Sequence, residues 1–592
     1  MIFFKSKKKD PLEHLDKKLL KSLNKKKLPT WKQLSHIGKY LNTWERLLID
    51  VLILVMAISG VWLLVYFYQA NSEAKPAFGG TIIEGMVQDP VYINPVLSTG
   101  NGTDADLCRL IYSGLLKYDK DLKLTPDLAE KYEISEDGKT YTFTLKSNLY
   151  FHNGEPLTVD DVIFTYNLIQ NPEYKSPQYL NLANIKVDRV DDQTVSFTTD
   201  SVYAPFIHSF TVGILPAHIW ENIGPANFPL AQYNIKPIGS GPYKFDKLLK
   251  DSFGNIANYE LSYFENYYGP KPYIPQMTFK FYDDQQTAIN ALVKGDINAL
   301  GNLPLKEKTF VEDGKSNVSV YQLTLPQYTA LFYNVKSDDL IKSAYFRQAL
   351  NLSIDKNQII NDVLKDNVQT VGGPILAGNF AWSQDLAQQN PDQEKAKQLM
   401  IDNGWTLSED NVWRKTINGT ATDATLKISI PNTEEILSVA NALKAAWESV
   451  GFKVEIQAID TTEIKQVIKE RNYQAIIYGE NIGADPDLFP FWHSTQIDYP
   501  GLNLSQMANK QIDTLIEEAR QTHDVLTRQA KYAELQKLII EENAALFLYS
   551  PKYLYALNNE IKNYQNMFIN NYAGRWNILG DLYIKSKSQI KW

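Results

Sequence analysis

"TLKISIPNTEEILSVANALKAAWESVGFKVEIQAI", residues 425–459, joins a strand pattern, a long helix pattern that Gly451 closes, and a second strand pattern. A helix pattern at 461–471, "TTEIKQVIKER", and a strand pattern at 473–479, "YQAIIYG", follow directly. Alternation at this spacing predicts parallel strands joined by right-handed crossovers, with helices on both faces of the sheet. The sequence therefore predicts an α/β fold for this part of the chain.

Polar loops follow the three strand patterns of this stretch. They are "PNT" after Ile430, "DTT" after Ile459 and "GENIG" after Tyr478. Open parallel sheets bind ligands beyond the carboxyl ends of their strands. We therefore expect the loop after Tyr478, which continues as the acidic and aromatic "ADPDLFPFWHS", to carry binding residues.

Two further units of the same kind precede this stretch. In residues 141–172 a strand pattern leads to a helix whose start is marked by Thr158 and Asp161, at capping-box spacing. In residues 276–300 a strand leads to a helix that ends at Lys294, with Gly295 as its C-cap. Both units support a folded α/β body that starts near residue 79.

The N-terminal segment has a different composition. Residues 1–46 carry a net charge of +9, so the rest of the 592-residue chain carries −17. "VLILVMAISGVWLLVYFY", residues 51–68, has no charged side chain and would span about 27 Å as a helix, close to the thickness of a bilayer. We predict a basic cytoplasmic head (1–46), a transmembrane helix (47–68) and a short linker (69–78).

Two alternatives compete for this segment. A cleaved signal peptide is possible, with "SEA" before Lys75 as the cleavage site, but the basic region is too long and the apolar stretch exceeds the usual 7–15 residues. A nucleic-acid role for the basic head is less favoured, because a long hydrophobic segment follows it. We therefore predict an uncleaved single-pass anchor, no nucleic-acid partner, and an exterior location for residues 79–592.

The sequence offers little catalytic chemistry. Its single cysteine, Cys108, excludes an internal disulfide and a cysteine-based zinc site, and motifs for nucleophilic elbows, zinc proteases and phosphate loops are absent. His493 lies near Asp485 and Asp487 and could bind a metal, although a capping or core role for these acids is favoured. We predict no enzymatic activity, no cofactor and no metal.

Longer stretches carry a resemblance to a known family. Residues 110–169, "LIYSGLLKYDKD…VIFTYNLI", are similar to the signature region of the extracellular solute-binding proteins, family 5, the peptide/nickel class that serves ABC importers. "PIGSGPYKF" (237–245), "ADPDLFPFWHS" (484–494) and "YAELQKLIIEENAALFLYSP" (532–551) match further along, so the resemblance covers roughly residues 79–575.

The resemblance implies a two-lobed, Venus-flytrap fold with an extra subdomain on the first lobe, preceded here by one transmembrane helix. Closure of the lobes over the solute would be a population shift driven by contacts that both lobes make only when shut. The family's pattern puts hinge strands near Leu325–Pro326 and Tyr549–Pro551. It places lobe I at about 79–115, 210–325 and 546–592, the inserted subdomain at 116–209, and lobe II at about 326–545.

The resemblance also implies ligand-binding residues. Peptide-binding relatives hold the ligand as an added strand between the lobes. The matching positions are Gly100, Asn101 and Gly102 on lobe I, and Gly479, Glu480, Asn481 and Asp485 on lobe II. For Gly100 and Gly102 a plain turn is an equal alternative. Trp382 and Trp492 are candidates for cleft walls; either could equally be core, and we expect one of the two to serve as a wall.

One departure from the family bears on the ligand. Many peptide-binding relatives carry an aspartate that pairs with the peptide's α-ammonium, at a position where this chain has Ile482 or Gly483. Glu480 could substitute, or it could be a solvated acid at a strand end. The expected partners are therefore a peptide or other small solute, with a sugar or nickel chelate left open, and an ABC permease and ATPase. A sensor or scaffold that signals through the basic head is the alternative to import.

Overall fold

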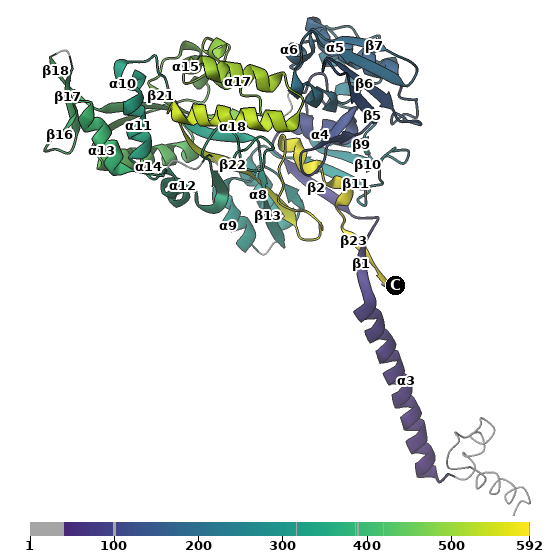
Figure 1. The fold of residues 1–592 in the computed structure, drawn as a ribbon. Coiled ribbons are helices and arrows are strands. Elements are labelled where there is room, and N and C mark those ends of the chain that lie inside the picture. The colour runs from purple at the N-terminus through teal and green to yellow at the C-terminus, as the bar shows by residue number, and fades with distance from the viewer. Residues whose placement is uncertain are drawn as a thin grey trace, which may run out of the picture. The chain divides into compact units, whose positions relative to one another are not determined.

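The structure is a computed structural model that describes residues 41–98, 102–314, 317–384, 386, 390–417 and 419–590. Residues Ala77–Lys585 form one compact unit, and the chain before Ala77 forms another with residues from Ser586 onward (Figure 1). Gly100 and Asn101 lie outside the described residues, as does most of the basic head.

The first unit is dominated by helix α3, Thr43–Asn71. Asn42 caps it in a capping box with Glu45, whose carboxylate accepts from the Asn42 backbone N–H at 2.7 Å. The most apolar 18-residue window of α3 has a mean hydropathy of 2.6, and none of the helix is buried by protein. The helix exceeds the predicted 47–68 at both ends. The predicted linker is also structured, because strand β1 (Ser72–Ala77) pairs with β23 (Lys585–Ile590).

In the second unit, one part of the main sheet forms lobe I. Its strand order is β22-β12-β2-β11-β10-β9, and β2 runs parallel to both β11 and β12. The predicted unit at 276–300 is confirmed: helix α8 ends at Lys294, and Gly295 follows with a left-handed φ of +83°. The bounds are β2 Thr81–Met86, β9 Tyr243–Lys250, β10 Ile256–Tyr263, β11 Gln276–Phe281, α8 Gln285–Lys294, β12 Ala299–Leu300, α9 Lys308–Asp313 and β13 Val318–Thr324.

A separate four-stranded sheet, in the order β5-β6-β8-β7, forms the subdomain between β2 and β9. Helix α5 covers it and begins as predicted, because Thr158 and Asp161 form a capping box. The bounds in and beside this subdomain are α4 Thr103–Ile111, β3 Leu116–Tyr118, β4 Leu124–Pro126, β5 Ala129–Ile134, β6 Thr140–Leu145, α5 Val159–Gln170, α6 Tyr179–Leu182, β7 Lys186–Arg189, β8 Thr194–Thr198, η2 Ala204–Thr211 and α7 Ala217–Trp220.

The other part of the main sheet forms lobe II, in the order β20-β19-β21-β14-β22. As predicted, β19 runs parallel to both β20 and β21, but β14 pairs antiparallel to β21 and to β22, so the sheet is mixed. The bounds are β14 Gln327–Tyr333, α10 Asp339–Lys342, α11 Ala344–Leu352, α12 Lys356–Leu364, β15 Val368–Thr370, α13 Gln393–Asp402, β16 Thr406–Leu407, β17 Trp413–Ile417, β18 Thr420–Asp423, β19 Thr425–Pro431, α14 Glu434–Ser449, β20 Lys453–Ile459, α15 Ile464–Glu470, β21 Ala475–Asn481, α16 Phe489–Trp492, α17 Lys510–Arg520, α18 Val525–Glu541 and β22 Ala545–Asn558.

Both faces of the lobe II sheet are buried, and the alternation in β14 shows how. Leu331 and Tyr333 face one hydrophobic cluster, which includes side chains of α11, α13 and α14. Tyr328, Ala330 and Phe332 face the opposite cluster, which includes side chains of α17 and α18. Successive residues of a strand point to opposite faces of the sheet, and residues paired on neighbouring strands point to the same face. A residue therefore enters the same cluster as its partner on the next strand.

The two lobes share the long strand β22. Its first half pairs with β14 and its second half pairs with β13. The chain therefore crosses between the lobes at Leu325–Pro326, between β13 and β14, and again at Ser550–Pro551 within β22. These crossings coincide with the predicted hinge strands.

Candidate functional site

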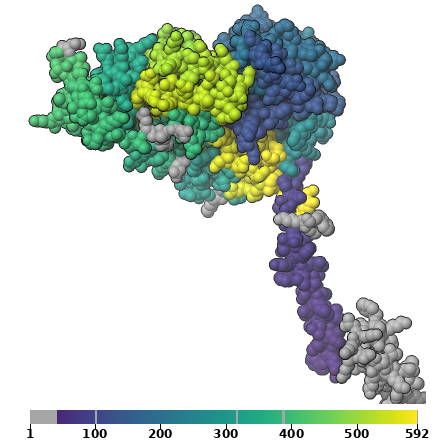
Figure 2. Space-filling view, viewed as in Figure 1, coloured from purple at the N-terminus to yellow at the C-terminus, as the bar shows by residue number. Residues whose placement is uncertain are grey.

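A cavity of about 420 Å³ takes its lining from the subdomain and from lobe II. Tyr118, Tyr203 and His208 line it on the subdomain side, and the loop that follows β21 lines it on the lobe II side. Figure 2 shows the surfaces of these two regions in direct contact, the subdomain in blue and α17–α18 in yellow-green. We treat this interlobe cavity as the candidate site, because a solute there would touch both regions.

The loop after β21 starts with tight local bonding. The Asn481 side chain accepts from the Gly483 backbone N–H at 3.0 Å, and Ile482 N–H donates to the Pro326 carbonyl at 2.9 Å. The chain then turns so that Asp485 and Asp487 both line the cavity. The sequence prediction of a functional loop at this strand end thus coincides with the cavity wall.

Asp485 has a partner on each side. Arg528 of α18 donates to it through both terminal nitrogens, with Nη1 at 2.8 Å from Oδ2, and Nε2 of His208 lies 3.5 Å from Oδ2. Burial raises the pKa of Asp485, but the bonds from His208 and Arg528 outweigh it and hold the pKa below its usual value. Asp485 is therefore ionised. Since Nε2 of His208 faces this carboxylate, Nδ1 accepts from the Tyr118 hydroxyl, 2.7 Å away.

Asp487 also contacts an arginine of lobe II and a side chain of the subdomain. The Tyr203 hydroxyl donates to its Oδ2 at 3.1 Å, the Phe489 backbone N–H donates to Oδ1 at 3.1 Å, and Nη2 of Arg520 lies 3.3 Å from Oδ2. The Arg520 guanidinium also lies over the Tyr203 ring, 4.8 Å from its centroid. Tyr203 belongs to the subdomain, so these contacts join it to lobe II.

A third contact joins the same two regions. Nε2 of His523 donates to the Gly138 carbonyl at 3.1 Å, and Gly138 has a left-handed φ of +69°. A Cβ at this glycine would come within 2.7 Å of the His523 ring, so only glycine permits the approach. We call the Tyr203–Asp487, His208–Asp485 and Gly138–His523 contacts the interlobe latch.

Glu480 does not have the predicted role. Strand pairing places it opposite Tyr328, whose hydroxyl donates to Oε2, and the residue is only 4% exposed. Burial raises the pKa of Glu480 well above its usual value, which favours the uncharged form of its side chain inside lobe II. The expectation that it meets a peptide's α-ammonium, or lies solvated at the strand end, is wrong because the ladder turns it toward the core.

The two tryptophans differ in burial. Trp492 is 1% exposed and its indole N–H donates to the Tyr328 hydroxyl at 3.2 Å, so Trp492 is the core residue and not a cleft wall. Trp382 is 42% exposed and lines a smaller cavity of about 120 Å³ in lobe II, with Gly372 and Gly373. Trp382 remains a prediction as a ligand contact.

The remaining predicted site residues lie apart from one another. Asn481 lines the interlobe cavity, and Gly479 is exposed on the same side of β21. Gly102, the N-cap residue of α4 with φ +84°, lines a separate lobe I pocket of about 320 Å³. Sequence reasoning did not find Tyr203, His208, Arg520 and Arg528, because each meets its partner only through the fold.

That lobe I pocket lies over a buried ionic group. Arg575 donates to both Asp106 and Glu84, with Nη2 at 2.9 Å and 3.1 Å, and the Tyr555 hydroxyl donates to Glu84 at 2.8 Å. Burial raises the pKa of Glu84 to about 7, because Arg575 and Tyr555 offset only part of the desolvation. Gly301 lines this pocket, where a Cβ would come within 2.1 Å of the Tyr553 hydroxyl oxygen.

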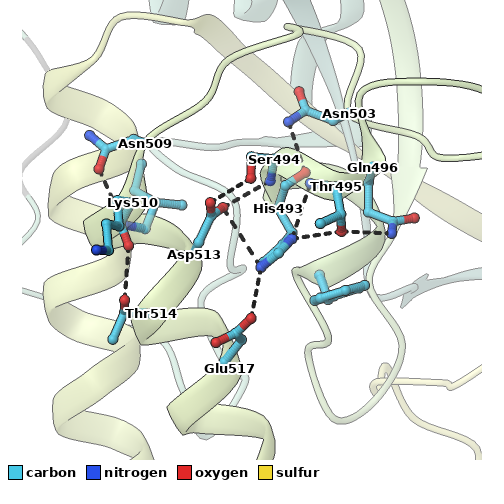
Figure 3. A network of polar contacts seen from close by, with 12 residues as sticks. His493, Ser494, Thr495, Gln496, Asn503, Asn509, Lys510, Asp513, Thr514 and Glu517 are labelled. Atoms are coloured by element: carbon cyan, nitrogen blue, oxygen red, sulfur yellow. Dashed lines mark hydrogen bonds and ion pairs between the residues drawn. The ribbon is translucent and has the colours of Figure 1, made fainter.

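The alternative of a metal at His493 is not supported by the placement of its neighbours. Figure 3 shows His493 beside Asp513 and Glu517 of α17, with Nε2 at 3.2 Å from Glu517, while Nδ1 bonds Thr495. Asp513 accepts from the Ser494 backbone N–H at 2.8 Å. Among the described residues, no group of three or more metal-ligating side chains comes together, and this network serves to join α16 and α17.

Comparison with known proteins decides the family. Residues 123–499 match the bacterial extracellular solute-binding proteins, family 5, in the middle region. The chain belongs to this family. The predicted two-lobed α/β fold, with an apolar helix before it, is confirmed by the relatives and the solved structures.

Three relatives of this family illustrate its range. The chain is 28% identical to the oligopeptide-binding protein AppA of Bacillus subtilis over 505 residues, which cover 84% of this chain and 90% of that protein. It is 26% identical to the dipeptide-binding protein of Escherichia coli, covering 85% and 95%. The substrate-binding protein CtaP of Listeria monocytogenes, at 26% identity, superposes with a TM-score of 0.73 over 86% of this chain and all of that one.

A structure with a different ligand is about as similar. NikZ of Campylobacter jejuni, solved with Ni(L-His), is 25% identical, with a TM-score of 0.67 over 84% of this chain and 99% of that one. Family membership therefore supports a solute-binding protein and leaves the class of solute to the residues of the cavity.

Proposed function

We propose that the chain is the membrane-anchored substrate-binding component of an ABC importer. It captures peptides between its lobes and delivers them to a permease that an ATPase drives, and it catalyses no reaction itself. The observation that carries the proposal is the interlobe cavity, whose walls come from two regions with separate hydrophobic cores, in a family of solute-binding proteins. Relatives named for oligopeptide and dipeptide binding favour peptides over sugars and nickel chelates.

Helix α3 supports the anchor. Its 29 residues would span about 43 Å at 1.5 Å per residue, enough to cross a bilayer, and its apolar side chains are exposed. With the basic head inside, residues 79–592 lie outside. We further propose the division given above with one correction. Residues 546–549 pair with β14 and belong to lobe II, so lobe I comprises about 79–115, 210–325 and 551–592, the subdomain 116–209, and lobe II about 326–550.

Native mass spectrometry of the full chain, purified in mild detergent, tests the proposal. Peptides should leave the protein when it is unfolded in the gas phase or by acid. A sugar or a nickel chelate as the retained solute would refute peptide capture. The loss of peptide uptake on deletion of the gene, with restoration by the intact chain, would separate import from a purely sensory role.

A further inference from the structure

The lobe II wall of the interlobe cavity carries two carboxylates, and neither is free. Asp485 and Asp487 line the cavity, and each faces an arginine from the helix pair α17–α18. Both oxygens of Asp485 accept from Arg528, and both oxygens of Asp487 accept hydrogen bonds, from Tyr203 and from the Phe489 backbone. Their acceptor capacity is largely used by the protein itself.

The charge of this wall is consequently balanced. Two arginines neutralise the two aspartates, and the other described lining residues of the cavity, His208 apart, carry no charged side chain. The nearby acid Glu480 is buried on the other side of β21, bonded to Tyr328. Ile482 and Gly483, which follow in the lining, have no charge to offer, and Ile482 is 3% exposed.

A solute with a free ammonium at this wall would lose its hydration without gaining a free carboxylate. Burying a charge without a partner is strongly unfavourable, and taking Asp485 or Asp487 from its arginine would leave that arginine unpaired instead. An uncharged polar or apolar group carries neither cost. The lining also holds the amide side chains of Gln178, Asn181 and Asn481, which carry no charge and can hydrogen-bond an amide of the solute.

We propose that the solute presents an uncharged group, and not a free ammonium, to the lobe II wall formed by Asp485, Asp487 and their arginines. The ligand class is therefore a peptide whose recognition does not use a free N-terminal ammonium, so that blocked and free forms are accepted alike. This proposal rests on the proposed function, because it assigns the class of peptide to the same cavity.

Calorimetry on the full chain in detergent tests it with matched peptides. The probes are tri-, penta- and nonapeptides of mixed sequence, each prepared with a free and with an acetylated N-terminus. We expect the acetylated form to bind within threefold of the free form, or more tightly. A preference of tenfold or more for the free form would overturn this proposal and leave the proposed function standing. Binding of neither form would refute peptide capture, and this proposal with it.

Variants provide a second, independent measurement. Arg520→Gln removes the arginine partner of Asp487, whose side chain is 17% exposed, and Arg528→Met removes the arginine partner of Asp485. Each should shift the ratio of affinities toward the free N-terminus by about tenfold. Lys531→Gln is the matched control. Lys531 lies on α18, as Arg528 does, and it pairs with Glu518 at 2.6 Å outside the cavity lining. An unchanged ratio in Arg520→Gln, with the fold intact by circular dichroism, would contradict the proposal.

Discussion

The interlobe latch should contribute to closure independently of the solute, and Tyr203–Asp487 is its most accessible part. Tyr203→Phe removes one hydroxyl that donates to a carboxylate at 3.1 Å. A hydrogen bond to a charged group contributes about 1.5–3 kcal/mol. The lower value applies, because Asp487 still has Nη2 of Arg520 as a partner at 3.3 Å in the variant. A loss of about 1.4 kcal/mol reduces the ratio of closed to open molecules about tenfold.

The apparent affinity for the solute should fall by up to the same factor, because the binding-competent closed state is less populated. Single-molecule FRET between dyes at Asp192→Cys on the subdomain and Glu463→Cys on lobe II, in a Cys108→Ser background, measures the populations directly. Asp487→Asn and the double variant complete a cycle that isolates the pair. A coupling energy near zero, with unchanged populations in Tyr203→Phe, would refute the latch.

Four further outcomes are expected. Burial raises the pKa of Glu84 from 4.5 to about 7. Between these pH values the folded state therefore binds more protons than the unfolded state, and the free energy of unfolding should fall by roughly 3 kcal/mol as the pH rises from 4.5 to 7. Glu84→Gln should flatten that dependence in urea midpoints, and an unchanged slope would argue against it. Glu480→Gln should change the free energy of unfolding by less than ~1 kcal/mol, because burial raises the pKa of Glu480 and favours its uncharged form, and the amide oxygen of glutamine can still accept from Tyr328, whereas a large loss would count against this reasoning. Protease added to intact cells should remove the large domain and leave a fragment of about the first 70 residues, and protection of the domain would contradict the topology. Saturating solute should reduce the radius of gyration in small-angle scattering, and an unchanged radius would count against closure.

Local patterns in the sequence predicted much of the fold. The capping box at Thr158 and the helix end at Gly295 were found because each signal lies within a few residues of the element it ends. The parallel arrangement of β19, β20 and β21 followed from the spacing of the strand and helix patterns. The antiparallel β14 escaped prediction, since its partners lie more than 140 residues away in the chain.

The residues of the cavity were harder to predict for the same reason. Glu480 resembles an exposed acid in sequence, and only its pairing with Tyr328, 152 residues earlier, reveals that it is buried. Asp485 resembles a ligand-binding acid, but Arg528, 43 residues later, already occupies it. Sequence patterns located the loop, while the charge balance within it depends on contacts between distant elements.

The placement of that loop links the solute to the crossings between the lobes. Pro326 lies at the first crossing and Pro551 at the second, and proline lacks the N–H that would continue a strand ladder. The Pro326 carbonyl accepts from Ile482, the first residue after β21, so the loop that carries both aspartates begins at the crossing itself. Asp485 and Asp487 hold the subdomain through His208 and Tyr203, so we expect a rotation at the first crossing to act on both aspartates. Because the latch residues also form the wall of the cavity, we expect any solute that separates an aspartate from its arginine to oppose closure. A neutral solute leaves both pairs intact and permits it.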